Sequence, residues 1–523
     1  MDRMPSVMNH DFSKVPKAEI QRSSFNRSHG YKTTMNFDEL VPIFVDEALP
    51  GDTFNLDMSG FGRLATPINP IMDNMYLDTF FFAVPCRLLW DNWEKFHGEQ
   101  TNPGDSTDYT VPVISTPSGG YDVGSLADYF GLPTDVDIED VNALHFRAYN
   151  LIYNEWFRDQ NLIDSLAVDT DEGPDDPADY VIKKRSKRHD YFTSSLPWPQ
   201  KGDAVNLPLG TAAPIVFDTY SGTDISGNFV INTGVGSTQP NTYYNSVYGD
   251  GTGANVIPNA SLNNLSADLS EATAATINQL REAFQVQKLY ERDARGGTRY
   301  TEIIKSHFGV TSPDARMQRP EYLGGNSTAL NINAIAQTSS TDATTPQGNL
   351  AAMGTVGFSR NGFSKSFTEH CVIIGLANIR ADLTYQQGIN RMWTRQTRFD
   401  YYYPALAHIG EQAVLSKEIY ADGSANDDDV FGYQERFAEY RYKPSQITGK
   451  FRSTYATSLD PWHLSQEFSS RPTLNETFIT SDTPIERCIA VVDEPHIIFD
   501  SYFDLKCVRP MPMYSVPGLI DHF

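Results

Sequence analysis

Strand-forming segments lie far apart along this 523-residue chain, and their separation constrains the fold more than any other feature. From Phe499 to Cys507, apolar or small residues alternate with Asp, Tyr and Lys, so one face of a strand seeks a core. Similar strand signals, bounded by Pro, Gly or charged residues, cover Leu40 to Val45, Thr53 to Met58, Tyr76 to Val84, Cys371 to Leu376 and Cys488 to Val492. We therefore expect a β structure that is completed by distant parts of the chain.

Helical spacing is found between these strand signals. Apolar residues recur on one helix face from Val141 to Trp156, and again from Ile277 to Phe284 before a Gly-Gly stop. A shorter helix is expected from Thr301 to Phe308, with Gly309 as its left-handed cap. We expect these helices to be inserted between strands.

The composition fits a β-rich, loop-heavy protein, with 36 Gly, 31 Pro, 27 Tyr and 30 Phe. The formal charge of −25 would repel a polyanion, so we expect any contact with nucleic acid to be local. The segment Met1 to Asn36 has six cations and three carboxylates, an excess of three positive charges. This arm could face phosphate, or it could be a solvated tail that orders on a neighbouring subunit.

Four cysteines, Cys86, Cys371, Cys488 and Cys507, are too widely spaced for a disulfide framework or a zinc site, so we expect them to be reduced and mostly buried. The longest apolar run, Phe80 to Val84, stops at a proline, and the chain starts without an apolar segment. We therefore expect neither secretion nor membrane insertion.

The segment from Asp203 to Ala267 has no Lys or Arg, and many Gly, Asn, Ser and Thr residues surround a few aromatic pairs such as Tyr243 and Tyr244. It is predicted to be a surface insertion that gains stability by packing against copies of itself. Two further surface loops are expected, the acidic Asp169 to Asp179 and the polar Gln337 to Asn349.

No catalytic motif with its required spacing is present, so we expect no enzymatic activity and no catalytic residues. An acidic β-rich protein could still be a glycosidase that uses two carboxylates. Glu435 and Glu439 would share a helix face if Phe431 to Tyr440 were helical, although solvated charge is the default interpretation.

Asp427, Asp428 and Asp429 could offer hard oxygen ligands to Ca²⁺. They lack the spacing of an EF-hand, and a surface turn after Gly423 is the favoured interpretation. We expect no cofactor, but a divalent cation at contacts between acidic subunits is possible.

The densest basic run comprises Lys183, Lys184, Arg185, Lys187 and Arg188, followed by Tyr191 and Phe192. Basic residues beside aromatic rings are typical of contacts with single-stranded nucleic acid, so these five cations are candidate DNA contacts. We favour the alternative that they pair with the preceding acidic stretch or with an acidic neighbour.

A second mixed segment alternates arginines with aromatic residues. Its members are Arg391, Trp393, Arg395, Arg398, Tyr401, Tyr402 and Tyr403. Arg and aromatic side chains are the usual anchors of protein interfaces, so a subunit interface is favoured over a DNA pocket.

Several long, irregular strings resemble one family. They include Arg27 to Thr34, Leu40 to Glu47, Pro50 to Leu56, Met72 to Phe82, Arg87 to Phe96, Lys187 to Phe192, Leu196 to Gly202, Glu291 to Tyr300, Ala381 to Gly388, Arg509 to Pro512 and Gly518 to Phe523. These strings resemble the major capsid protein of gokushoviruses, which are single-stranded DNA bacteriophages of the microvirus group. Asp203 to Ala267 is the part that carries no such resemblance.

The resemblance implies an eight-stranded antiparallel jelly roll with inserted helices and long loops. Expected parts are an N-terminal arm (1–36), a first core part (37–202), an insertion that protrudes at the threefold axes and meets the host (203–267), and a second core part (268–523). The resemblance also implies that the protein assembles with copies of itself in the bacterial cytoplasm. The product would be a T=1 icosahedral capsid, the shell of the virion, around circular single-stranded DNA.

The same resemblance implies several partners besides further copies of the chain. These are an internal scaffolding protein, a small basic DNA-binding protein, a DNA pilot protein and a receptor on the host surface. The competing hypothesis is a carbohydrate-binding or glycoside-cleaving protein, because jelly rolls also occur in lectins and enzymes.

Overall fold

The computed structural model describes residues 21–203, 205, 215–217, 265–267, 277–296, 300–308, 318–339, 341 and 346–514. The chain divides into two compact units, one made of Met1–Pro199 with Val310–Phe523 and the other of Gln200–Gly309. The first unit contains the two large sheets, and the second contains the expected insertion together with the helices that follow it.

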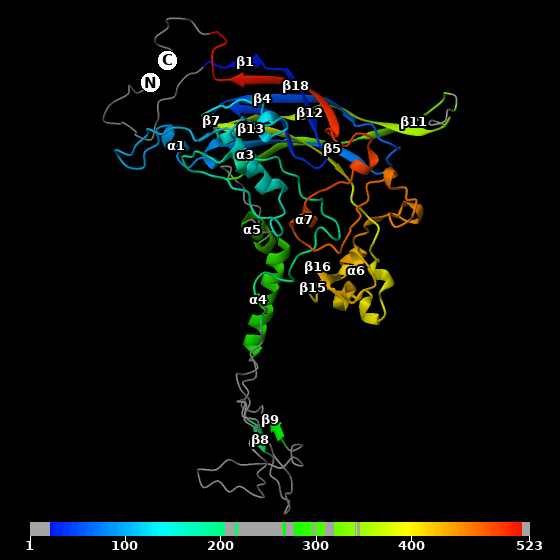
Figure 1. The fold of residues 1–523 in the computed structure, drawn as a ribbon. Helices are drawn as coiled ribbons and strands as arrows, with labels where there is room; N and C mark the ends of the chain where they lie inside the picture. Colours follow the sequence, from blue (N-terminus) through cyan, green and yellow to red (C-terminus); the bar gives the residue numbers. More distant parts are fainter. Residues whose placement is uncertain are drawn as a thin grey trace, which may run out of the picture. The chain divides into compact units, whose positions relative to one another are not determined.

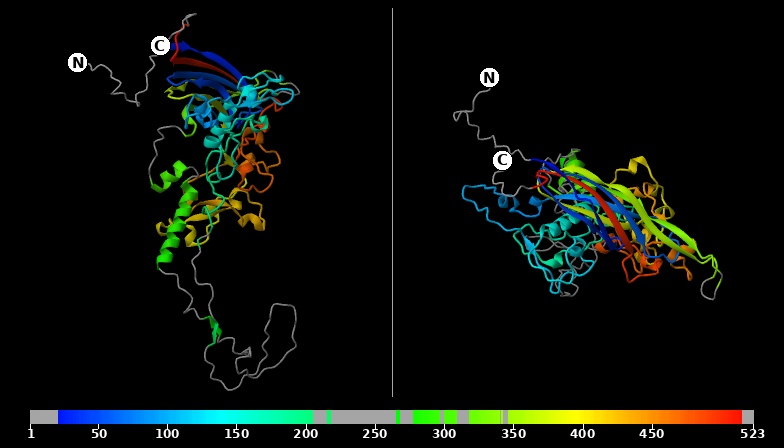
Figure 2. Two further views of the ribbon diagram at one scale, coloured as in Figure 1. Left: turned by 90° about the vertical axis from the view of Figure 1, so that its left-hand side faces the viewer. Right: turned by 90° about the horizontal axis from the view of Figure 1, so that it is seen from above.

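One face of the first unit is an antiparallel six-stranded sheet (Figure 1). Its path runs through β1 (Ser23–Asn26), β18 (Ile497–Arg509), β4 (Thr53–Leu64), β12 (Leu350–Ser366) and β11 (Asn331–Ala336), and β2 (His29–Met35) also pairs with β18. Seen from above, these strands run side by side although they come from opposite ends of the sequence (Figure 2). The second half of the expected N-terminal arm is therefore part of this sheet.

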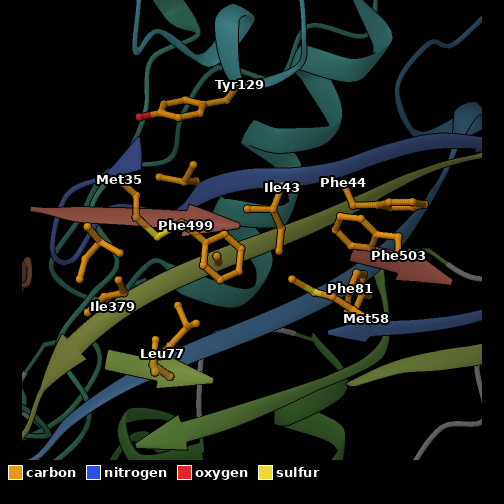
Figure 3. Close-up of a cluster of buried hydrophobic side chains, with 14 of the residues drawn as sticks. Met35, Ile43, Phe44, Met58, Leu77, Phe81, Tyr129, Ile379, Phe499 and Phe503 are labelled. Carbon is orange, nitrogen blue, oxygen red and sulfur yellow. The ribbon is translucent and has the colours of Figure 1, made fainter. Parts of the chain in front are cut away.

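The second sheet has four antiparallel strands. Their order is β10 (Glu321–Ala329), β5 (Met75–Pro85), β13 (Cys371–Ala381) and β3 (Val41–Ala48). Side chains of both sheets meet in one apolar core, in which the Phe44 ring of β3 lies 5.2 Å from the Phe503 ring of β18 (Figure 3). Close approach requires a glycine in β13, because a Cβ at Gly375 would lie 2.8 Å from atoms of Phe44 and Phe81.

The alternation that predicted a strand near Phe499 is confirmed. Phe499, Phe503 and Leu505 are completely buried between the sheets, whereas Tyr502 on the opposite face is 55% exposed. The predicted mainly β, antiparallel class is also confirmed. Within the described residues the two sheets have six and four strands, so the expected number of eight is not confirmed.

The outer face of the four-stranded sheet is covered by a second apolar cluster. Helix α3 (Leu144–Ile152), followed by a π-helical turn (Tyr153–Phe157), packs its Phe146 and Tyr149 rings into this cluster with Phe82 of β5. This confirms the helix predicted from Val141 to Trp156. Strand β13 is buried on both faces for this reason, which explains its nearly continuous apolar sequence.

One predicted strand is wrong, and the predicted acidic surface loop, which is mostly accessible to solvent, contains one buried residue. Cys488 to Val492 does not form a strand, because a 3-10 helix (Glu486–Cys488) occupies its start and a single bridge joins Ile489 to Pro67. Asp175, within the expected acidic surface loop, is buried, because its carboxylate binds Arg147 of α3.

A third apolar cluster lies in a lobe formed by the chain after β13. The hairpin β15 (Glu411–Leu415) and β16 (Val430–Glu435) packs Val414 and Phe431 against Tyr191, Phe192 and Tyr385. Short helices α6 (Ser416–Ile419) and α7 (Glu476–Ile479) complete it. The helix considered for Phe431 to Tyr440 is absent, because this segment is β16 followed by a 3-10 helix (Ala438–Tyr440).

The second unit contains α4 (Ile277–Gly296) and α5 (Tyr300–Phe308), which confirms both helices predicted there. Gly309, the expected cap, lies outside the described residues. Strands β8 (Ile215–Phe217) and β9 (Leu265–Ala267) pair with each other.

The remaining elements of the first unit are short. They are α1 (Trp93–Phe96), α2 (Leu126–Tyr129), the two-residue strands β6 (Val113–Ile114), β7 (Val141–Asn142), β14 (Thr384–Tyr385) and β17 (Ser445–Gln446), and 3-10 helices at Cys86–Leu88, Pro177–Asp179, Arg391–Trp393, Arg398–Asp400, Pro404–Leu406, Ala425–Asp428, Gly449–Phe451 and Asp460–Trp462. All four cysteines are free and buried, as predicted. None of the described helices combines the length and apolar character that crossing a membrane requires.

Candidate functional site

The basic run from Lys183 to Arg188 is partly built into the fold. The Lys187 ammonium donates to the Phe478 carbonyl oxygen at 2.5 Å and to Gln466 Oε1 at 3.2 Å. Burial lowers the pKa of Lys187 to about 8. The Arg185 guanidinium, also largely enclosed, lies 3.1 Å from a carboxylate oxygen of Asp78. Two of the five candidate DNA contacts therefore serve the subunit's own structure.

The other three cations of the run are more accessible. Lys184 Nζ lies 2.7 Å from Asp482 Oδ1, Lys183 is half-buried, and Arg188 is exposed. None of these described cations forms an ion pair with Asp169 to Asp179, so the pairing expected with that stretch is wrong, whereas pairing with an acidic neighbour stays a prediction. Lys184 and Arg185 do pair with carboxylates of the same chain, but Asp482 and Asp78 lie far from them in the sequence.

The segment that begins at Arg391 is a series of short 3-10 helices on the third cluster's lobe. Asn390 begins the first one by accepting the Met392 backbone N–H, and the Asp400 carboxylate accepts the backbone N–H groups of Gln396 and Thr397. A third turn starts at a proline, Pro404, which suits the first position of a helix. These local bonds fix the backbone without burying the aromatic side chains, and Trp393 remains 74% exposed.

The structure brings this segment together with a second one, from Arg436 to Lys443, that sequence reasoning did not connect to it. The Arg395 guanidinium lies 4.2 Å from the centre of the Tyr440 ring and 5.6 Å from that of Tyr401. The Tyr402 ring lies 5.4 Å from that of Phe437, and the Arg436 side chain donates to the Phe399 carbonyl oxygen. Six cations and two carboxylates lie in the two segments.

A small cavity of about 60 Å³ adjoins these segments. Its lining includes Tyr191, Arg391, Glu418, Glu439 and Tyr442. Burial raises the pKa of Glu418, while its ion pair with Arg391 at 3.0 Å opposes that rise. Glu439 also forms an ion pair with an arginine.

The carboxylate of Glu439 lies 3.1 Å from the Arg395 guanidinium and accepts a hydrogen bond of 2.6 Å from Gln412. Both buried carboxylates are thus bound to arginine, which favours a structural role over general acid or base chemistry.

Asp427 and Asp428 face cationic side chains. The Arg471 guanidinium lies 3.2 Å from Asp427, and the Lys417 ammonium lies 2.5 Å from Asp428. The turn expected after Gly423 is confirmed as a 3-10 helix (Ala425–Asp428). In the described part of the chain, no group of three or more His, Cys, Asp or Glu is arranged to hold a metal ion.

The expected surface insertion is described only at Asp203, residue 205 and the short strands β8 and β9. Its aromatic residues Tyr243 and Tyr244 lie outside the described residues.

Comparison with known proteins identifies the family. The family model "Capsid protein (F protein)" matches residues 13–519. The chain is 52% identical to capsid protein VP1 of Bdellovibrio phage phiMH2K over 98% of both chains, and 46% identical to capsid protein VP1 of Chlamydia phage 1 over 99% of both. It is 39% identical to capsid protein VP1 of Spiroplasma virus 4, over 98% of this chain and 97% of that relative.

These relatives carry the name of a structural protein, so this chain is a component of a virion rather than an enzyme. With almost its full length matched, the chain belongs to the capsid protein (F protein) family, as its resemblance to gokushovirus major capsid proteins predicted.

Proposed function

We propose that copies of this capsid protein close a T=1 icosahedral shell around circular single-stranded DNA. The match along nearly the whole length of other capsid proteins carries this proposal, because it includes the core strands and the segments inserted between them. A shell of identical subunits needs several different contact surfaces on each copy. The exposed loops and the lobe around β15 and β16 provide such surfaces.

Electron microscopy of the full-length protein, produced in bacteria together with the phage's other proteins, tests the shell. Uniform hollow particles of one size are expected. A monomer that binds or cleaves a carbohydrate would contradict the proposal and support the competing lectin or glycosidase hypothesis.

Packaging of the genome is proposed to depend on a small basic DNA-binding protein, because a chain with a net charge of −25 cannot neutralise DNA alone. An internal scaffolding protein and a DNA pilot protein are the other proposed partners, with assembly in the bacterial cytoplasm. The isolated subunit should bind single-stranded DNA weakly at physiological salt, as measured by fluorescence anisotropy. Tight binding would contradict the charge argument.

The insertion from Asp203 to Ala267 is proposed to meet a receptor on the host surface. Support comes from its composition, which lacks Lys and Arg and is rich in small polar residues. Deleting the insertion should leave the thermal unfolding of the core unchanged and reduce attachment of particles to host cells. Particles that lack the insertion and still attach normally would contradict this role.

Divalent cations between acidic subunits are the remaining proposal. Treatment of particles with a chelator should lower their melting temperature if such ions are bound, and adding back Ca²⁺ or Mg²⁺ should restore it. An unchanged melting temperature would contradict the proposal. Substituting Asp427, Asp428 and Asp429 with Asn would then test whether these residues supply the ligands.

A further inference from the structure

The two joined segments 391–403 and 436–443 form a surface that we call the aromatic-arginine face. Large side chains that are 43% to 74% exposed gather there, namely Met392, Trp393, Phe399, Tyr401, Tyr402, Tyr403, Tyr440 and Tyr442. The two segments hold four more cations than carboxylates, although Glu418 and Glu435 outside them pair with Arg391 and Arg441, and the whole chain carries a net charge of −25. A surface this apolar and this unlike the rest of the protein is typical of a binding site.

The aromatic-arginine face is ordered before any partner binds. The ion pair between Arg395 and Glu439 fixes the guanidinium over the Tyr440 ring, and the Arg398 guanidinium lies 5.4 Å from the centre of the Phe399 ring. Preorganised Arg and aromatic side chains lose little conformational entropy on binding, which is why they dominate the energetics of protein interfaces.

A surface of opposite charge lies elsewhere on the same unit. A groove of about 450 Å³, which we call the acidic groove, is lined by residues 36–39, Lys184 and parts of 482–496. Its lining has six carboxylates and one lysine, and the carboxylates are Asp38, Glu39, Asp482, Glu486, Asp493 and Glu494. The last four are exposed, and Val492 in the lining is 48% exposed, so the groove offers apolar contact besides charge.

We infer that the aromatic-arginine face of one copy docks into the acidic groove of a second copy. This inference rests on the proposed shell and specifies one of its contacts. Copies that each carry a net charge of −25 repel one another, so close approach needs a local pairing of opposite charges. Among the described residues, no hydrogen bond or ion pair joins the face to the groove within one chain. Arg391, Arg395 and Arg441 already pair with carboxylates of their own chain, so the exposed Arg398 and Lys443 are the cations best placed to meet a neighbour.

The pairing has a geometric consequence for the shell. Where a single face-to-groove contact joins two copies, the contact is heterologous, and repeating it around a fivefold or threefold axis closes a ring. A twofold axis would instead need two such contacts between the same two copies, each face in the other copy's groove. Single-stranded DNA could use the same arginines and aromatic rings, but the net charge of −25 on the chain opposes its binding.

Charge reversal on full-length chains tests the inference. Arg398→Glu with Lys443→Glu reverses two exposed cations of the face, and Asp493→Lys with Glu494→Lys reverses two exposed carboxylates of the groove. A third chain carries all four substitutions. Arg63→Glu with Lys506→Glu, at two exposed cations of the six-stranded sheet, is the matched control. Particle yield is measured by sedimentation and electron microscopy, and circular dichroism checks that the unassembled subunits fold.

Each two-site reversal should lower particle yield at least about tenfold, since like charges then face each other across the contact. The four-site chain should recover most of the wild-type yield, and the control should stay close to wild type. Failure of the four-site chain to recover, with all subunits folded, overturns the pairing. Normal yields of empty particles from the face variant would instead assign the face to DNA and also overturn it. A wild-type chain that forms no particles contradicts the proposed shell itself.

Discussion

Arg147 and Asp175 form a two-point ion pair in which neither side chain is exposed to solvent. Arg147 belongs to α3, and Asp175 lies in the loop that follows, so the pair ties this loop to the outer face of the four-stranded sheet. Removing one partner would leave a buried charge without compensation, which is far more destabilising than the loss of an exposed pair.

Asp175→Asn should therefore lower the free energy of unfolding of the unassembled subunit by about 3–5 kcal/mol. Urea denaturation followed by tryptophan fluorescence measures this change. Asp171 offers a matched control, since its carboxylate lies 3.6 Å from the same guanidinium but its side chain is 79% exposed. Asp171→Asn should cost less than about 1 kcal/mol. Equal effects of the two substitutions would show that the buried pair has no special role.

Phe503 and Tyr502 are neighbours on β18 that point to opposite faces of the sheet. Phe503→Ala should lower the free energy of unfolding by about 3–5 kcal/mol, because it opens a cavity between the two sheets. Tyr502→Ala removes a side chain of similar size from the exposed face and should cost about 1 kcal/mol or less. Chemical denaturation of both variants measures the contrast, and a reversed order would contradict the assigned faces.

Lys187 should give the subunit a pH-dependent stability. Burial lowers its pKa from an ordinary value of about 10.4 to about 8. Between these values the unfolded chain holds a proton that the folded chain has lost, so this group makes the free energy of unfolding rise with pH. Below about pH 8 the full penalty of the buried charge is present.

The difference in unfolding free energy between the wild type and Lys187→Met should accordingly change by up to about 1.4 kcal/mol per pH unit between about pH 8 and about pH 9.5. Denaturation at a series of pH values measures it. A difference that does not vary across this range would mean that Lys187 is solvated.

The basic run makes a prediction for the genome as well. Replacing Lys183 and Arg188, which keep solvent access, with Gln should lower the DNA content of particles without lowering the yield of shells. The ratio of absorbance at 260 nm to that at 280 nm of purified particles reports DNA content. Unchanged DNA content would count against a genome role. Arg185→Gln is the comparison, because Arg185 pairs with Asp78 inside the subunit and its loss should lower the stability of the subunit.

The strands of the two sheets could be predicted because alternation along a strand is a local signal. Phe499 to Cys507 shows this clearly, since each second side chain enters the core. The strand predicted from Cys488 to Val492 was wrong because no alternation supported it. A short apolar run has no periodicity of its own, and here it packs as a 3-10 helix and an irregular segment.

The polar interior was harder to predict. Asp175 was assigned to a surface loop because its neighbours are acidic, yet its partner Arg147 falls between Leu144 and Ala148 on the apolar stripe of α3. An arginine in such a stripe is a usable signal that a carboxylate must lie nearby. Lys187 gave no comparable signal, because its acceptor on Phe478 lies 291 residues away.

The aromatic-arginine face was predicted only in part. The cluster from Arg391 to Tyr403 was recognisable by composition, whereas the second segment around Tyr440 joins it through contacts across 40 residues or so. Composition identifies a segment that is suited to binding, but only the fold shows which segments form one surface.

Strand β18 lies between β4 and the pair β1 and β2, although it follows every strand of the opposite sheet along the chain. The ribosome must therefore synthesise all four strands of the second sheet before β18, the middle strand of the first sheet, exists. Until β18 is made, the edge of β4 that it will cover has no hydrogen-bonding partner, and such an open strand edge can pair with other chains and cause aggregation. The six-stranded sheet can therefore be completed only once nearly the whole chain has been synthesised.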